Sequence, residues 1–397
     1  MQNDGRVDSL DVLRGAAVLL VLFRHLPGYD GSGPVDFIQS IGWTGVDLFF
    51  VLSGFLISGL LFSEFDRTGN LDVKRFWLRR GLKIWPSYYL VYGLAMLLTI
   101  IATGNSQLLI TRAPNYVFVQ NYFERAVRWN HSWSIAVEEH FYLLLPLVLL
   151  VLIPAKLKNL PKILLVTCGF ALAFRVFLFF LRDLGWTNFY YPTHMRIDSL
   201  SFGVLLGYLY QYKTDSFISV GRRFRPLFLI APVLLLLAHI FPVETSPISY
   251  TIGFTVFYLV FGGLVVAARA YPEFGRSGPA RLIALAGVYS YTIYLAHSVL
   301  YELPGMLTVR RMIFPYFGSS GDRVLFFGLS IILGVVISHL IERPFLRLRA
   351  KWFPSHDALL SRPLRTSALK EPLTAETAEI RRPQREELSF GESGARQ

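Results

Sequence analysis

LDVLRGAAVLLVLFRHL, residues 10–26, is the stretch that decides the fold class, because it is long enough to cross a membrane yet carries Arg14 near its start and His25 near its end. An α-helix turns by about 100° and advances by about 1.5 Å per residue, so Arg14 and His25 share one face and lie roughly 16 Å apart along the axis. Ionisable groups within a bilayer face protein or water rather than lipid. The stretch therefore predicts a membrane helix with a polar face that lines a path.

The whole chain is far more apolar than an ordinary soluble domain. Its 397 residues are 53% hydrophobic, 15% aromatic and 17% charged, and the mean hydropathy is +0.45. Apolar runs of about 17 to 25 residues are long enough to cross the hydrocarbon as helices. We therefore predict an all-α polytopic membrane bundle of about ten transmembrane helices. The expected spans cover residues 10–26, 42–62, 82–103, 133–153, 161–181, 195–212, 226–241, 247–269, 282–300 and 322–341.

Lys and Arg residues in the connecting segments predict the orientation of these helices. Basic side chains are concentrated in alternate segments and after the last span, whereas residues 27–41 and 242–250 carry no Lys or Arg. Cytoplasmic loops hold the excess of positive charge, so both termini are expected in the cytoplasm. We interpret the first span as a retained signal anchor, because Arg14 interrupts its apolar run and no small-residue cleavage site follows before Pro27.

Composition also predicts two regions. Residues 1–350 form the expected ten-helix transmembrane domain, whereas residues 351–397 hold eight Lys or Arg and seven Asp or Glu with little apolar periodicity. We interpret this second region as a disordered cytoplasmic tail. Because the tail is nearly neutral, the net charge of +12 belongs to the membrane part, and we expect a lipid bilayer and no nucleic acid as its partner. The single cysteine, Cys168, excludes an intramolecular disulfide or a cysteine-based zinc site, and we predict no metal.

Acidic and imidazole side chains gather in the outer half of the predicted bundle. Ser134, Glu138 and Tyr142 recur at four-residue intervals and therefore share one face of the helix expected from residue 133. Asp47 enters the second span from the same outer side. Further polar positions expected near this side are His194, Arg196, Asp198 and His297.

Four motifs recur along the chain in a fixed order. They are the Arg-x10-His pattern of Arg14 and His25, GVDLFFVLSGFLI at Gly45–Ile57, WSIAVEEHFY at Trp133–Tyr142 and ERPF at Glu342–Phe345. These motifs resemble those of the acyltransferase-3 family of integral membrane O-acyltransferases, and the resemblance covers roughly residues 8–349. Their order and spacing across the chain make the resemblance specific.

The basic signature before the third span departs from the usual family pattern. The family commonly has Arg-x-x-Arg there, whereas this chain has Arg80 followed by Lys83. The substitution keeps the positive charge but loses the planar, forked guanidinium that binds an oxyanion through two bonds.

The resemblance implies transfer of an acyl group, expected to be acetyl, from coenzyme A to a hydroxyl, commonly of a saccharide. A hydroxyl attacks a thioester well only when its proton is removed, and a neutral imidazole is the usual base, so His25 is the candidate. Glu138 is expected at the same depth, where a carboxylate can fix the tautomer of the imidazole, and Asp47 is its substitute. Direct transfer and an acyl-enzyme are both compatible with these residues.

The acyl-CoA donor is anionic, and a basic helical stripe could hold its phosphates. Arg75, Arg79 and Lys83 recur at four-residue intervals with Arg80 beside them, and Arg14 would continue the path inward. Topology alone also accounts for a basic segment here. We expect Glu342, which ends the last span, to pair with Arg14. The positions assigned supporting roles are Ser134, Tyr142, Arg196, Asp198, His297 and Glu342.

Three functions are therefore compared. The preferred one is acylation of an extracytoplasmic saccharide by an enzyme of the bacterial inner membrane. The second is acylation of a small diffusible product such as a macrolide, as some family members of similar length do. The third is transport, because buried Arg, His, Glu and Asp also line transporter pathways.

Overall fold

The computed structural model describes residues 8–28, 33–123, 130–155, 157–276, 278–301 and 304–354. These residues form helices and connecting turns, with no β-strand among them, so the predicted all-α class is confirmed. The tail predicted over residues 351–397 lies, after Pro354, outside the described residues.

Six helices of the described part are long and apolar enough to cross a membrane. They are α3 (Thr44–Thr68), α4 (Val73–Thr103), α8 (Trp133–Leu152), α9 (Leu160–Leu181), the segment Ser249–Ala270 and the segment Phe314–Trp352. The other four predicted spans are helical too, but they are shorter, broken or less apolar. They correspond to α1 (Asp8–Arg24), α11 (Thr193–Tyr212), α13 (Leu227–Ile240) and the pair α15 (Gly278–Val288) and α16 (Ser290–Tyr301). The structure therefore supports six spans, and the number ten stays a prediction.

Shorter helices and π-helical turns connect or extend these elements. The segment Ser249–Ala270 consists of the π-helical turn η3 (Ser249–Gly253) and α14 (Phe254–Ala270). The remaining elements are α2 (Pro34–Ile41), α5 (Leu108–Thr111), α6 (Ala113–Tyr116), α7 (Gln120–Phe123), η1 (Asn130–Ser132), η2 (Ile153–Ala155), α10 (Thr187–Tyr190), α12 (Thr214–Arg223), η4 (Pro272–Arg276), α17 (Pro304–Ile337), η5 (Ser338–Glu342) and α18 (Arg343–Trp352).

Helix α4, which carries the basic stripe, has clear start and stop signals. The carboxylate of Asp72 accepts a hydrogen bond from the backbone N–H of Arg75 at 2.9 Å, which satisfies one of the free donors of the first turn. Gly104 ends the helix in the left-handed conformation with φ 68°, and its N–H bonds the carbonyl of Ile100. The stripe residues therefore belong to one continuous helix.

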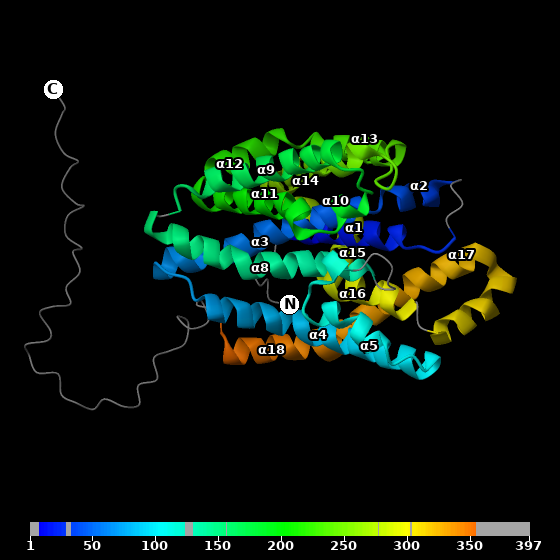
Figure 1. The fold of residues 1–397 in the computed structure, drawn as a ribbon. Coiled ribbons are helices and arrows are strands. Elements are labelled where there is room, and N and C mark those ends of the chain that lie inside the picture. Colours follow the sequence, from blue (N-terminus) through cyan, green and yellow to red (C-terminus); the bar gives the residue numbers. More distant parts are fainter. Residues whose placement is uncertain are drawn as a thin grey trace, which may run out of the picture. The chain divides into compact units, whose positions relative to one another are not determined.

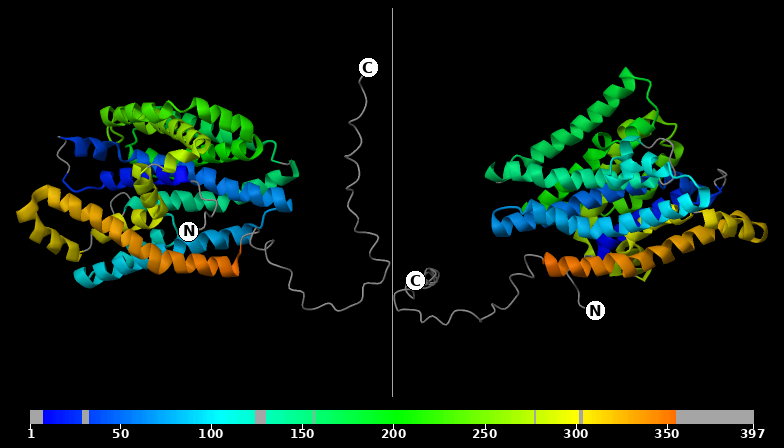
Figure 2. Two further views of the ribbon diagram at one scale, coloured as in Figure 1. Left: turned by 180° about the vertical axis from the view of Figure 1, so that it is seen from behind. Right: turned by 60° about the horizontal axis from the view of Figure 1, so that its bottom comes forward.

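Glycines bring the central helices into close contact. A Cβ atom on Gly54 of α3 would lie 2.1 Å from the carbonyl oxygen of Leu200 in α11. On Gly15 of α1 it would lie 1.9 Å from the carbonyl oxygen of Ile283 in α15. Small residues of this kind allow membrane helices to pack backbone against backbone. Figures 1 and 2 show α1 packed among its neighbours α3 and α15.

Two buried ion pairs tie α3, α9 and α11 together. Arg196 donates to Asp47 at 2.5 Å, and Arg175 donates to Asp198 at 2.7 Å, with all four side chains fully buried. Arg175 also donates to the carbonyl oxygens of Thr251 and Met195. Buried charges are costly unless they are paired and hydrogen-bonded, so these contacts hold the three helices in one fixed arrangement.

Candidate active site

Two pockets meet beside α1, and Val46 and Tyr294 line both of them. The first, called the aromatic pocket, has a volume of about 260 Å³ and is lined by Arg24, His25, Trp43, His131, Trp133, Trp186, Tyr190, Tyr191, Glu244 and Tyr294 among others. The second, called the basic pocket, has a volume of about 180 Å³. Its polar lining residues are Arg14, Ser53, Arg80, Lys83, Ser134, Glu138, Ser290, Tyr291 and Tyr294.

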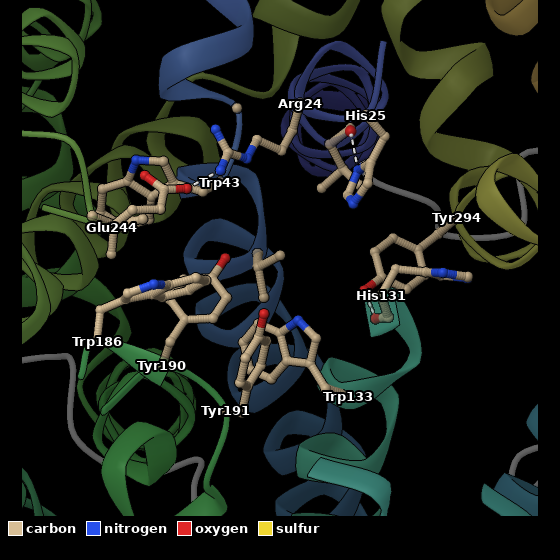
Figure 3. A pocket seen from close by; sticks show the side chains of 14 residues that line it. Arg24, His25, Trp43, His131, Trp133, Trp186, Tyr190, Tyr191, Glu244 and Tyr294 are labelled. Carbon is tan, nitrogen blue, oxygen red and sulfur yellow. Dashed lines mark hydrogen bonds and ion pairs between the residues drawn. The ribbon is translucent and has the colours of Figure 1, made fainter. Parts of the chain in front are cut away.

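His25 follows the last residue of α1, and its side chain is exposed to the aromatic pocket. Its Nδ1 atom lies 2.9 Å from the carbonyl oxygen of Val21. A carbonyl only accepts, so this contact assigns the proton to Nδ1 and leaves the lone pair on Nε2. In Figure 3 the imidazole ring of His25 extends from the end of α1, and Nε2, the ring nitrogen without a dashed line, points into the pocket. The geometry is that of an imidazole able to accept a proton from a bound ligand.

Two further histidines pack against His25. The ring centroid of His297 lies 4.8 Å from that of His25 and 4.7 Å from that of His131, and both contacts are edge-to-face. The Nδ1 atom of His297 bonds the carbonyl oxygen of Tyr294 at 2.5 Å. Burial lowers the pKa of His131 to about 3, so its ring is neutral at physiological pH. The three imidazoles form a cluster of edge-to-face contacts, and in the described residues no group of three or more His, Cys, Asp and Glu is arranged to hold a metal ion.

His297 was predicted as a supporting residue, whereas His131 was not singled out. The structure places both beside His25. A signal for His131 is available in the sequence, because the residue lies two positions before Trp133, which begins the Trp-Ser motif and α8.

Glu138 lies in the basic pocket. Its carboxylate accepts hydrogen bonds from the Ser53 hydroxyl at 3.0 Å and the Tyr142 hydroxyl at 2.7 Å, and it lies 3.9 Å from the Arg80 guanidinium. The predicted face that joins Glu138 and Tyr142 is therefore present. The structure does not join Glu138 to His25 by a hydrogen bond, and the carbonyl of Val21 holds the imidazole tautomer instead.

Ser134 lies where the two pockets meet. Its hydroxyl is 2.5 Å from the hydroxyl of Tyr294, which in turn donates to the carbonyl oxygen of His131 at 2.5 Å. Tyr294, which the sequence interpretation did not single out, therefore connects the histidine cluster with the face of α8 that carries Glu138.

Asp47, Arg196 and Asp198 lie behind the aromatic pocket. The Arg196 guanidinium, paired with Asp47, lies 3.8 Å from the ring centroid of Phe254 and 5.1 Å from that of Tyr190. A cation held over aromatic faces stabilises their positions. Asp47 therefore reaches the pocket wall only through its ion pair with Arg196.

The cationic residues predicted to bind the donor divide into two sets. Arg14, Arg80 and Lys83 line the basic pocket, and Arg80 donates to the Tyr142 hydroxyl at 2.6 Å. Arg79 instead donates to the backbone carbonyl of Phe353, directly after α18.

Arg349 of α18 is a further cation that the sequence interpretation missed. It lies close enough to Arg79, Arg80 and Lys83 for their charges to interact. Basic residues after the last span were interpreted only as a sign of topology, which is why Arg349 was overlooked.

Arg14 and Glu342 have local partners. The Arg14 guanidinium lies 3.8 Å from the carboxylate of Asp11, and Glu342 accepts a hydrogen bond from Ser338 at 2.8 Å within η5. The pairing of Arg14 with Glu342 stays a prediction.

These features indicate an integral membrane protein whose candidate site is an imidazole in the wall of an aromatic pocket that adjoins a basic pocket. The acyltransferase domain family matches residues 7–343, and the chain belongs to this family. The resemblance drawn from the motifs is thereby confirmed.

Individual relatives are O-acetyltransferases by name. The chain is 30% identical to the peptidoglycan O-acetyltransferase OatA of Listeria monocytogenes over 73% of its own length and 49% of the relative. It is 28% identical to a putative O-acetyltransferase of Staphylococcus aureus over 88% of its length and 59% of the relative. The chain thus spans about half to three-fifths of these curated relatives. No solved structure matches it.

Proposed function

We propose that this protein is a membrane O-acyltransferase that moves an acyl group, expected to be acetyl, from acyl-CoA to a hydroxyl of an extracytoplasmic saccharide. Membership of the acyltransferase family supports the reaction class. A relative named as a peptidoglycan O-acetyltransferase supports a glycan as acceptor.

The observation that carries the proposal is the position of His25 in the wall of the aromatic pocket, which shares Val46 and Tyr294 with the basic pocket. Its Nε2 atom would accept the proton of the acceptor hydroxyl as the oxygen attacks the thioester carbonyl. The new C–O bond forms, the C–S bond breaks, and the proton ends on the thiol of coenzyme A. The hydrogen bond from Nδ1 to the Val21 carbonyl keeps Nε2 free for this step.

The basic pocket has the chemistry expected for the donor. Arg14, Arg80 and Lys83 place three cations against the single carboxylate of Glu138 among its described lining residues. Charge-assisted hydrogen bonds from such groups are strong for phosphate oxygens. The rest of the lining is largely apolar, including Phe49, Leu56, Ile57 and Leu60, and would accommodate the neutral arm of the donor. The thioester would reach His25 past Tyr294.

The proposal includes a direction across the membrane. The basic segments favour a cytoplasmic position for the termini and the start of α4. Arg14 would then lie in the half of α1 nearer the donor, and His25 would follow the opposite end of the helix. An acceptor hydroxyl would then arrive at His25 from outside the cytoplasm, while coenzyme A returns to it.

Sealed proteoliposomes of known orientation test the proposal. Labelled acetyl-CoA is enclosed on the side of the termini, and a membrane-impermeant saccharide is supplied on the other side. We expect label in the external saccharide. Acylation only of acceptors on the donor's side would contradict the direction and favour a diffusible acceptor such as a macrolide. Solute movement without any acylation would favour a transporter.

A further inference from the structure

An ion pair between Arg24 and Glu244 borders the aromatic pocket next to His25. Arg24 is the residue directly before His25, and Glu244 lies between α13 and η3, 220 positions further along the chain. Both side chains are about one-third exposed, at 32% and 30%. In Figure 3 the pair lies on the opposite side of the pocket from Tyr294 and His131. A partly exposed pair of this kind contributes little to folding, so its position at the pocket calls for another explanation.

The wall below this pair consists of four aromatic rings in mutual contact. Ring centroids of Trp186 lie 5.4 Å from Tyr190 and 5.6 Å from Tyr191, and those of Trp133 lie 4.7 Å and 5.4 Å from the same tyrosines. The Arg196 guanidinium supports this wall from behind through its contact with Tyr190. The rings are therefore held in place by contacts within the protein, as a preformed binding surface requires.

This combination of groups suits a carbohydrate. The C–H face of a pyranose ring is apolar and packs on an aromatic ring, while its hydroxyls need hydrogen-bond partners at the edge. A guanidinium supplies several donors and a carboxylate supplies acceptors, so together they can satisfy neighbouring hydroxyls. The indole N–H of Trp43, also at this pocket, is buried and has no hydrogen-bond partner among the described residues, which leaves a further donor.

The volume of the pocket limits what it can hold. At about 260 Å³ it is slightly smaller than the range of about 300 to 1,000 Å³ that is usual for pockets binding drug-sized ligands. One sugar ring is a suitable occupant, whereas several linked rings would have to extend outside.

We propose that Arg24, Glu244 and Trp186 form a subsite that binds one pyranose ring of the acceptor and presents one of its hydroxyls to Nε2 of His25. The link to catalysis rests on the proposed function, whereas the binding of the sugar does not.

Steady-state acetyl transfer and direct binding together test this subsite. The purified full chain in nanodiscs is assayed with methyl glucoside, methyl galactoside and methyl N-acetylglucosaminide, and binding is followed by saturation-transfer NMR. We expect Arg24→Gln and Glu244→Gln each to raise the acceptor KM about tenfold while the donor KM stays unchanged. We expect Trp186→Leu to weaken sugar binding by a similar factor, whereas Trp186→Phe keeps most of it.

Two controls separate recognition from structure. Arg310→Gln breaks an ion pair with Asp322, and neither residue lines either pocket. The Arg310 side chain is 30% exposed, close to the 32% of Arg24, so the substitution should leave the acceptor KM unchanged. The exchange Arg24→Glu with Glu244→Arg restores an ion pair but inverts its polarity. Recovery of the wild-type acceptor KM in this double variant would show a structural role and overturn the proposal.

The outcomes also separate the subsite from the proposed function. Sugar binding that depends on Arg24 and Glu244, without acetyl transfer by the wild type, would support the subsite and contradict the enzyme. If the wild type transfers acetyl groups and neither substitution changes the acceptor KM, the proposed subsite is wrong and the proposed enzymatic function is retained.

Discussion

The two pockets beside α1 are built from different kinds of sequence. The basic pocket takes Arg14, Arg80 and Glu138 from long helices, where Arg14 interrupts an apolar run and Arg80 belongs to the basic segment at the start of α4. The aromatic pocket takes part of its wall from residues 186–191, which include the short helix α10, and from residues 243–244, which lie between longer helices. Connecting segments can change without disturbing the helices that they join. If the proposed function is correct, we infer that the basic pocket serves a fixed anionic donor and that the aromatic pocket is adapted to a particular acceptor.

Substitution of His25 is expected to have the largest effect on acetyl transfer, and it tests the separate roles of the two pockets. We expect His25→Ala to reduce acetyl transfer by about 10² to 10⁴ while donor binding remains, because removal of a general base typically costs this much in rate. Turnover and coenzyme A binding are measured on the same purified protein. His339→Ala removes an exposed histidine from the end of the last span and is the matched control. Near wild-type turnover of His25→Ala would show that another group removes the proton.

Asp47 tests whether the wall of the aromatic pocket depends on the buried charges behind it. We expect Asp47→Asn to destabilise the fold by about 3 to 5 kcal/mol, because Arg196 would be left as an unpaired buried cation. Thermal unfolding in detergent measures this loss, with Asp183→Asn, at an exposed carboxylate, as the control. Unchanged thermal stability together with lost transfer would instead support Asp47 as the substitute carboxylate for His25.

Sequence alone predicted the helical class and much of the basic pocket, because ionisable residues within apolar runs are conspicuous and helical spacing fixes which of them share a face. Ser134, Glu138 and Tyr142 are an example, since one helix positions all three. The same reasoning could not show that Glu138 contacts Arg80 and Ser53 rather than His25, because that depends on how separate helices pack. The glycine contacts of α1 and α3 that decide this packing carry no periodic signal.

The aromatic pocket was missed for a related reason. Tryptophan and tyrosine at the ends of spans are typical of the membrane interface, so the sequence gives no reason to select Trp186 or Tyr191. The motif in the first span includes His25 and not its neighbour Arg24, so Arg24 was not selected. Glu244 lies in a connecting segment that contains no motif. Only the tertiary structure brings these residues to one cavity.

Arg349 offers the finest test of the basic pocket, since it lies on α18 and outside every motif. It interacts electrostatically with Arg79, Arg80 and Lys83, and also with the carboxylate of Glu342. Like charges brought together repel, and a bound anion would relieve that repulsion. We expect Arg349→Gln to raise the donor KM by a few fold before it lowers kcat, and Arg347→Gln, at an exposed position of the same helix, to leave it unchanged.

Ionic strength distinguishes a donor contact from a role in membrane topology. The difference in donor KM between Arg349→Gln and the wild type should shrink as salt rises, because added ions screen partly exposed charges from the donor phosphates. A contribution to topology would behave differently: it would lower the amount of correctly inserted protein in both variants and leave the KM of the inserted fraction unchanged at every salt concentration. Equal donor KM values for Arg349→Gln and Arg347→Gln at low salt would therefore remove α18 from the donor site and confine phosphate binding to Arg14, Arg80 and Lys83.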